Sequence, residues 1–144
     1  MTRRSDPLMM TIVLAGFAVM LSACAPPPPP PAPPTTATSG TFTATASTVG
    51  PPKWTYSVTT SGSTNIGSIE FITSIDQSNC TFSPPTGWTA VTGSGSTVIS
   101  DPNAAGAVTV GFDVECDFTN GPVYLKVTDL GGTTKTLGTI AGPV

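Results

Sequence analysis

The 144-residue chain contains no histidine, and only 9% of its residues are charged. The absence of histidine removes the usual general base, the Ser–His–Asp triad and a common metal ligand. Residues 24–144 carry three lysines against seven acidic residues, so the basic surface that nucleic acids require is missing. No phosphate-binding glycine loop is present either. These absences disfavour an enzyme and a nucleic-acid-binding protein, and the sequence calls for no cofactor or metal.

One long apolar run lies near the start of the chain. Two arginines precede an apolar stretch over residues 8–21, and Ser22 and Ala23 follow as small residues. This order is typical of a secretory signal peptide, and the stretch is shorter than the roughly 20 residues of a membrane-spanning helix. We therefore expect residues 1–23 to be a removed signal peptide, with a retained membrane anchor as the alternative.

The four residues Leu21-Ser22-Ala23-Cys24 resemble the lipobox of bacterial lipoproteins. The resemblance implies that Cys24 receives a diacylglyceryl group on sulfur, that the chain is cut just before it, and that the new amine is often acylated, for example with palmitate. Two or three acyl chains hold a protein stably on a bilayer. The resemblance thus implies a lipoprotein exported to the cell membrane or outer membrane of a bacterium. Ordinary signal cleavage after Ala23 or Ala25 is the alternative.

Two further cysteines, Cys80 and Cys116, form an even pair once Cys24 is assigned to lipid. An oxidising compartment favours a disulfide between them, which would contribute about 3–4 kcal/mol by the loop-entropy relation. Two buried free thiols are the alternative. Metal binding is disfavoured, because the chain has neither histidine nor a Cys-x-x-Cys spacing.

A biased segment separates Cys24 from the rest of the chain. Residues 26–34 are almost all proline, which favours polyproline II and a semi-rigid spacer of about 28 Å. Residues 35–49 have only Phe42 and Val49 as sizeable apolar side chains, too few to offset the entropy of ordering. We expect a disordered linker over residues 24–50. Recognition of the proline tract by an aromatic-lined groove is the other possible role.

Residues 51–144 show an apolar residue at every second position in several runs. The longer runs cover residues 54–59, 69–75, 108–118 and 123–128, and shorter ones cover 87–91, 97–100 and 134–140. Such alternation is typical of antiparallel strands with one buried face. The sequence predicts an all-β protein, a small antiparallel β-sandwich of about seven strands with immunoglobulin-like architecture. The cysteine and tryptophan spacing differs from that of true antibody domains.

Three acidic residues, Asp113, Glu115 and Asp117, are spaced to project from the same face of one strand. Neighbouring carboxylates repel each other unless a cation is near, so a Ca²⁺ site or a basic partner is one hypothesis. We favour a solvated strand face, because carboxyl groups about 7 Å apart on a flat strand chelate poorly. Lys126 is the expected cross-strand partner.

Trp88 ends the turn Pro84-Pro85-Thr86-Gly87 and is a second candidate for binding. An exposed tryptophan at a loop tip suits stacking on a sugar ring or anchoring an interface. Packing back onto the end of the sandwich is the interpretation we favour, and Trp54 is expected in the core. The sequence as a whole favours a non-enzymatic structural or assembly role toward an unknown envelope protein. A carbohydrate- or ligand-binding module is the alternative.

Overall fold

The structure is a computed structural model that describes residues 27–144. Most of its strands are segments in which apolar residues alternate with threonine and serine. The expected signal peptide and Cys24 lie outside the described residues. Residues 31–144 form one folded unit of β-strands, with a single-turn 3₁₀ helix at Gln77–Asn79. Among the described residues, no helix has the length and apolar character needed to cross a membrane.

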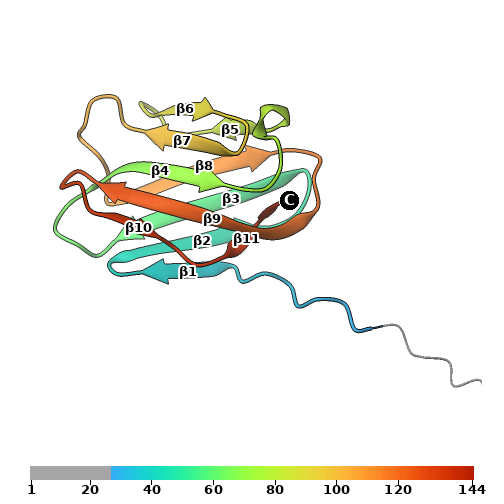
Figure 1. Cartoon of the computed structure of the whole chain (residues 1–144). Helices are drawn as coiled ribbons and strands as arrows, with labels where there is room; N and C mark the ends of the chain where they lie inside the picture. The colour runs from blue at the N-terminus through green and yellow to red at the C-terminus, as the bar shows by residue number, and fades with distance from the viewer. Residues whose placement is uncertain (1–26) are drawn as a thin grey trace, which may run out of the picture. The chain divides into compact units, whose positions relative to one another are not determined.

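The strands form two antiparallel sheets, which we call sheet A and sheet B (Figure 1). Sheet A contains β1 (Thr36–Ser39), β2 (Phe42–Thr48), β3 (Lys53–Thr60), β5 (Thr81–Ser83) and β8 (Thr109–Glu115). Sheet B contains β4 (Ile66–Ile72), β6 (Thr89–Thr92), β7 (Ser96–Ser100), β9 (Asn120–Asp129), β10 (Thr134–Thr136) and β11 (Ile140–Pro143). The spatial orders are β1-β2-β3-β8-β5 and β10-β9-β4-β7-β6, and β11 also pairs with β9.

The predicted all-β antiparallel sandwich is confirmed, with more strands than expected. The described chain has eleven strands because β1, β2 and β5 were not anticipated and the run at 134–140 divides into β10 and β11. The neighbour orders β2-β3-β8-β5 and β10-β9-β4 correspond to the A-B-E-D and G-F-C orders of an immunoglobulin constant-type sandwich. The hairpin of β6 and β7 is added beside β4.

The expectation that residues 35–49 are disordered is wrong, and the boundary at residue 51 is wrong with it. These residues form β1 and β2, and β2 pairs with β3 along nearly its whole length. Phe42, Ala44 and Ala46 all face the core and are buried. The alanines bury little area themselves, but Ala44 and Ala46 lie opposite Val58 and Tyr56 on β3, which are also buried. Backbone pairing and this shared core order the segment.

The core is centred on an aromatic cluster between the sheets. The ring of Tyr56 stacks on Phe112 at a centroid distance of 5.1 Å and meets the edge of Phe71 at 5.5 Å. Its hydroxyl donates a 2.7 Å hydrogen bond to the Ala141 carbonyl on β11. Burial raises the pKa of Tyr56, so the phenol stays neutral and remains a donor. Trp54 is fully buried as expected.

The segment that leads into β1 is held by both sheets. The Thr35 carbonyl accepts a 2.8 Å hydrogen bond from the Ala46 amide on β2. The preceding carbonyl, that of Pro34, accepts a 2.8 Å bond from the Ala141 amide on β11. Because β2 belongs to sheet A and β11 to sheet B, both sheets hold this segment, which lies well before residue 51.

A buried glutamine supports the crossing from sheet B to sheet A. Gln77 lies in the 3₁₀ turn between β4 and β5 and is fully buried. Its amide donates to the Phe71 carbonyl at 3.2 Å, and its side-chain oxygen accepts a 2.6 Å bond from the Thr97 hydroxyl on β7. The two bonds satisfy polar groups that would otherwise be costly to bury.

We expect Thr97→Val to lower the free energy of unfolding by about 1–3 kcal/mol. Valine preserves the shape of threonine but leaves the Gln77 oxygen buried without a donor. Urea unfolding followed by tryptophan fluorescence measures the effect. Thr89→Val is the matched control, because its hydroxyl bonds the Ser100 carbonyl at an exposed site and its loss should change stability by less than about 0.5 kcal/mol. Equal effects of the two substitutions would contradict the role of Gln77.

Candidate functional site

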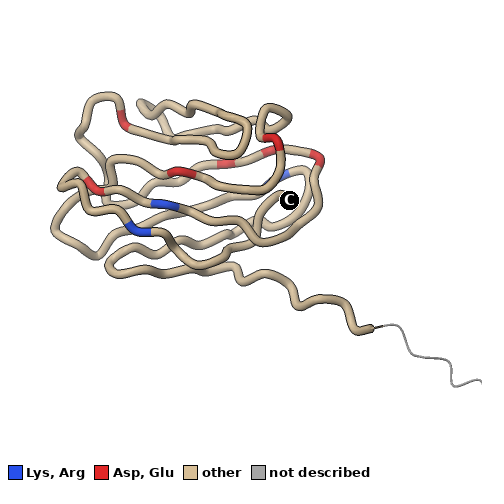
Figure 2. Tube along the Cα trace, in the orientation of Figure 1, with Lys and Arg blue, Asp and Glu red and all other residues tan. Residues whose placement is uncertain are grey.

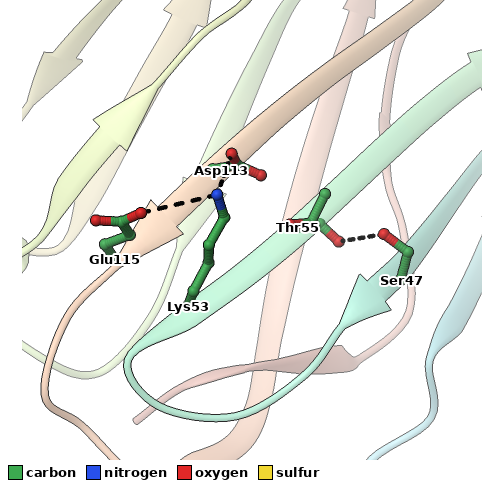
Figure 3. Close-up of polar contacts among 5 residues, drawn as sticks. All are labelled: Ser47, Lys53, Thr55, Asp113 and Glu115. Carbon is green, nitrogen blue, oxygen red and sulfur yellow. Dashed lines mark hydrogen bonds and ion pairs between the residues drawn. The ribbon is translucent and has the colours of Figure 1, made fainter.

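Among the residues that the structure describes, the largest group of interacting charges lies on the outer face of sheet A, where β3 and β8 run side by side. In the strand register Lys53 is opposite Glu115, and Thr55 is opposite Asp113. The Lys53 ammonium reaches diagonally to Asp113, with Nζ 2.8 Å from Oδ2, and lies 3.7 Å from Glu115 Oε1 (Figure 3). One lysine therefore lies between two of the three carboxylates singled out from the sequence.

The expectation that Lys126 pairs with these acids is wrong. Lys126 lies on β9, which belongs to the other sheet, and its Nζ is 3.3 Å from Oε2 of Glu70 on β4. The third acidic residue, Asp117, follows Cys116 beyond the end of β8 and takes no part in the ion pairs of Lys53. The partner was missed because the predicted alternating run begins at residue 54, so Lys53 was not assigned to the strand that it begins.

The electrostatics of this cluster are those of an ion pair. The hydrogen bond from Lys53 is the main cause that lowers the pKa of Asp113, and the same bond raises the pKa of Lys53. Within residues 27–144 no group of three or more acidic, cysteine or histidine side chains is placed to hold a metal ion.

We expect Lys53→Met to return the pKa of Asp113 toward its ordinary range, as measured by carboxyl NMR titration. Because folding lowers this pKa, the stabilisation is present above the unfolded-state pKa and is lost as the pH falls through the folded-state value. Lys126→Met is the control, since that lysine pairs with Glu70 and should leave Asp113 unchanged. An unshifted Asp113 in the Lys53 variant would contradict the pairing.

The predicted disulfide is present. Cys80 and Cys116 are bonded, with their Cα atoms 4.6 Å apart. Cys80 lies just before β5 and Cys116 just after β8, so the bond fixes the short edge strand β5 to its neighbour. It lies within sheet A, unlike the inter-sheet disulfide of antibody domains.

Trp88 is not a free loop tip. It lies immediately before β6, is partly buried and packs against the hydrophobic core. Its amide donates to the Pro85 carbonyl at 3.0 Å, which closes the turn, and Gly87 adopts a positive φ of 86° there. The packing of Trp88 matches the interpretation favoured from the sequence and leaves only part of the ring for a ligand.

Hydroxyl groups cover much of the outer face of sheet A, as the small fraction of charged residues predicts. The strand registers align threonine and serine side chains in rows across β1, β2, β3 and β8. One row is Thr38, Thr43, Thr59 and Thr109, and the next is Thr36, Thr45 and Ser57. Neighbouring strands lie about 4.8 Å apart, so the rows form a closely spaced polar surface. Hydroxyl groups, more than charges, therefore solvate this face.

Charges are absent from one side of the sandwich. Residues 77–100, which include β5, β6 and β7, contain no Asp, Glu, Lys or Arg. Figure 2 shows this part of the described chain without charged positions. In the same region Val91 and Val98 lie on the outer face of sheet B. They are 68% and 37% exposed, respectively. An uncharged, partly apolar strand edge is therefore the second candidate surface.

Comparisons of the chain with protein-family models, with curated proteins and with solved structures gave no match.

Proposed function

We propose that this chain is an exported bacterial lipoprotein that displays its β-sandwich on the cell envelope and acts there by non-enzymatic contact. The observation that carries the proposal is Leu21-Ser22-Ala23-Cys24, placed directly after a basic start and an apolar run. The acyl chains on Cys24 would be the membrane contact, since the few lysines offer little attraction to anionic lipid.

Two features of the folded unit support export. The Cys80–Cys116 disulfide suits an oxidising compartment and is uncommon in cytosolic proteins. It also leaves Cys24 as the one cysteine outside the bridge, as the lipid assignment requires. The candidate site supports a role in contact rather than catalysis, because its lysine is occupied by two carboxylates.

The spacer between lipid and domain is shorter than the sequence boundaries implied. Because Pro34 and Thr35 are hydrogen-bonded to the two sheets, nine residues, 25–33, separate Cys24 from the attached segment. Most of these residues are proline, which at ~3.1 Å per residue reaches about 28 Å in polyproline II. The sandwich would then stand close to the bilayer, with the attachment point shared by both of its sheets.

Intact-mass spectrometry of the membrane fraction tests the proposal. We expect a chain that starts at Cys24, carries two or three acyl groups and has a mass two hydrogens lower for the disulfide. Cys24→Ala should abolish acylation and cleavage, whereas Cys80→Ala should leave the anchor intact and change only the disulfide. Wild-type protein recovered in the soluble fraction with an unmodified Cys24, or with Arg3 and Arg4 retained, would overturn the proposal.

A further inference from the structure

Strand β6 forms an unprotected edge of sheet B. It is the outermost strand in the sheet order, and no other strand of residues 27–144 pairs with its free side (Figure 1). Proteins commonly protect such edges with charges, prolines, bulges or short strands. The sequence of β6, Thr-Ala-Val-Thr, has neither charge nor proline, and its Val91 is 68% exposed.

The other edges carry protection that β6 lacks. Strand β5 has three residues and is fixed beside the disulfide. Strand β10 is equally short and carries Lys135, a residue typical of protected edges. Strand β1 directly follows the proline tract, which cannot extend a ladder of hydrogen bonds. Edge pairing is therefore more favourable at β6 than at β1, β5 or β10.

The register fixes which backbone groups of β6 are available. The hairpin closes with the Gly93 amide bonded to the Ser96 carbonyl at 2.8 Å. Hydrogen-bonded pairs alternate along an antiparallel ladder, so the groups of Val91, which is opposite Val98, also point toward β7. The N–H and C=O groups of Ala90 and Thr92 consequently point to the free edge.

We infer that this edge pairs with β6 of a second copy of the chain, antiparallel and about a two-fold axis. One register satisfies all four free groups: Ala90 of each copy opposite Thr92 of the other. That register places the two copies of Val91 directly opposite each other as a non-hydrogen-bonded pair, with Cα atoms about 4.5 Å apart. The interface is isologous, as expected for a two-fold dimer.

The side chains on the outer face fit this register. One row across sheet B reads Lys126, Glu70, Val98 and Val91. Doubling it about the axis gives four valines at the centre and a Glu70–Lys126 ion pair at each end, an apolar centre with a polar rim. The absence of charge over residues 77–100 also means that the two edges do not repel each other.

Four residues per copy make a small interface, well below the ~1,000 Å² of stable complexes. We therefore expect weak pairing in solution that becomes populated when the chains share one membrane, where tethering raises their effective concentration. This part of the inference rests on the proposed lipid anchor, but the geometry of the edge does not.

Cysteine cross-linking of the full mature lipoprotein in liposomes tests the inference. Val91→Cys should oxidise to a disulfide dimer, because 4.5 Å falls within the Cα separations that disulfides accept. Thr89→Cys is the matched control, since it lies on the same strand and face but about 13 Å from its copy along the strands in this register. We expect at least a tenfold higher dimer yield for Val91→Cys. Adding Ala90→Pro, which removes a donor at the free edge, should reduce that yield several-fold.

Peptide mass analysis identifies the cysteines joined and verifies that Cys80–Cys116 is intact in each variant. Absence of a Val91→Cys dimer, or equal yields from Thr89→Cys, would overturn the pairing. Failure of the lipid anchor is distinguishable, because the protein would then not float with the liposomes and the wild type could cross-link through an unmodified Cys24. The two cysteine variants would in that case be compared in concentrated solution, where the same ratio is expected.

Discussion

Replacing Phe42 with alanine is expected to lower the free energy of unfolding by about 3–5 kcal/mol, as full truncation of a buried phenylalanine does. The side chain lies on the inner face of β2 and is 1% exposed. Its removal would leave a cavity beneath the first two strands of sheet A. A disordered linker would show no such effect, so the substitution tests whether residues 36–48 belong to the folded unit.

Urea unfolding followed by the fluorescence of buried Trp54 measures the Phe42→Ala effect. Val49→Ala is the control: Val49 lies just after β2, is partly exposed, and should change stability by less than about 0.5 kcal/mol. A loss below about 1 kcal/mol for Phe42→Ala would mean that β1 and β2 unfold apart from the remaining strands.

Removal of the disulfide should have an effect of similar size. The bond closes a loop with a sequence separation of 36 residues, for which the chain-entropy relation gives about 3–4 kcal/mol. The double variant Cys80→Ala/Cys116→Ala avoids leaving a lone thiol. Because domains of this size are stable by roughly 5–15 kcal/mol, the expected loss is a large fraction of the total.

A reducing agent provides the internal control for the disulfide prediction. It should destabilise the wild-type chain by about the same amount as the double substitution and leave the double variant unchanged. Equal stability of oxidised and reduced wild-type protein would contradict a structural role for the bond.

The strands predicted from the sequence are those with large alternating side chains. Strand β3 is recognisable in the sequence from Trp54, Tyr56 and Val58, and β9 from Val123, Leu125 and Val127. Each of these side chains buries enough apolar area to define the inner face of its strand. Strands β1 and β2 carry mostly alanine on that face, so their pattern resembles a polar linker. Their order depends on neighbours that a local pattern does not contain.

Most of strand β11 lies beyond the run predicted over residues 134–140, for a related reason. Its sequence, Ile-Ala-Gly-Pro, shows no alternation of apolar and polar residues, yet the strand is buried and pairs with β9. Gly142 is needed there, because an added Cβ would lie 2.6 Å from Val123 Cγ2 and 2.7 Å from the Tyr56 hydroxyl oxygen. Only the tertiary structure shows that this glycine serves close packing.

Some features of the candidate site were likewise predictable from the sequence, and others depend on the tertiary structure. The Cys80–Cys116 bond was predictable by counting cysteines, and the buried side of Trp88 from the usual behaviour of such turns. The partner of Asp113 was not, because it depends on which strand lies beside β8, and strand neighbours are set by topology rather than by sequence spacing. The free edge of β6 likewise depends on its position as the last strand of sheet B.

The scarcity of basic residues has a consequence for proteolysis. A trypsin-like enzyme could cut residues 24–144 only after Lys53, Lys126 or Lys135, and each of these lies within a paired strand. Cleavage there requires the strand to detach first, so digestion reports local opening of the fold. The folded domain is therefore expected to resist trypsin-like enzymes until one of these strands opens.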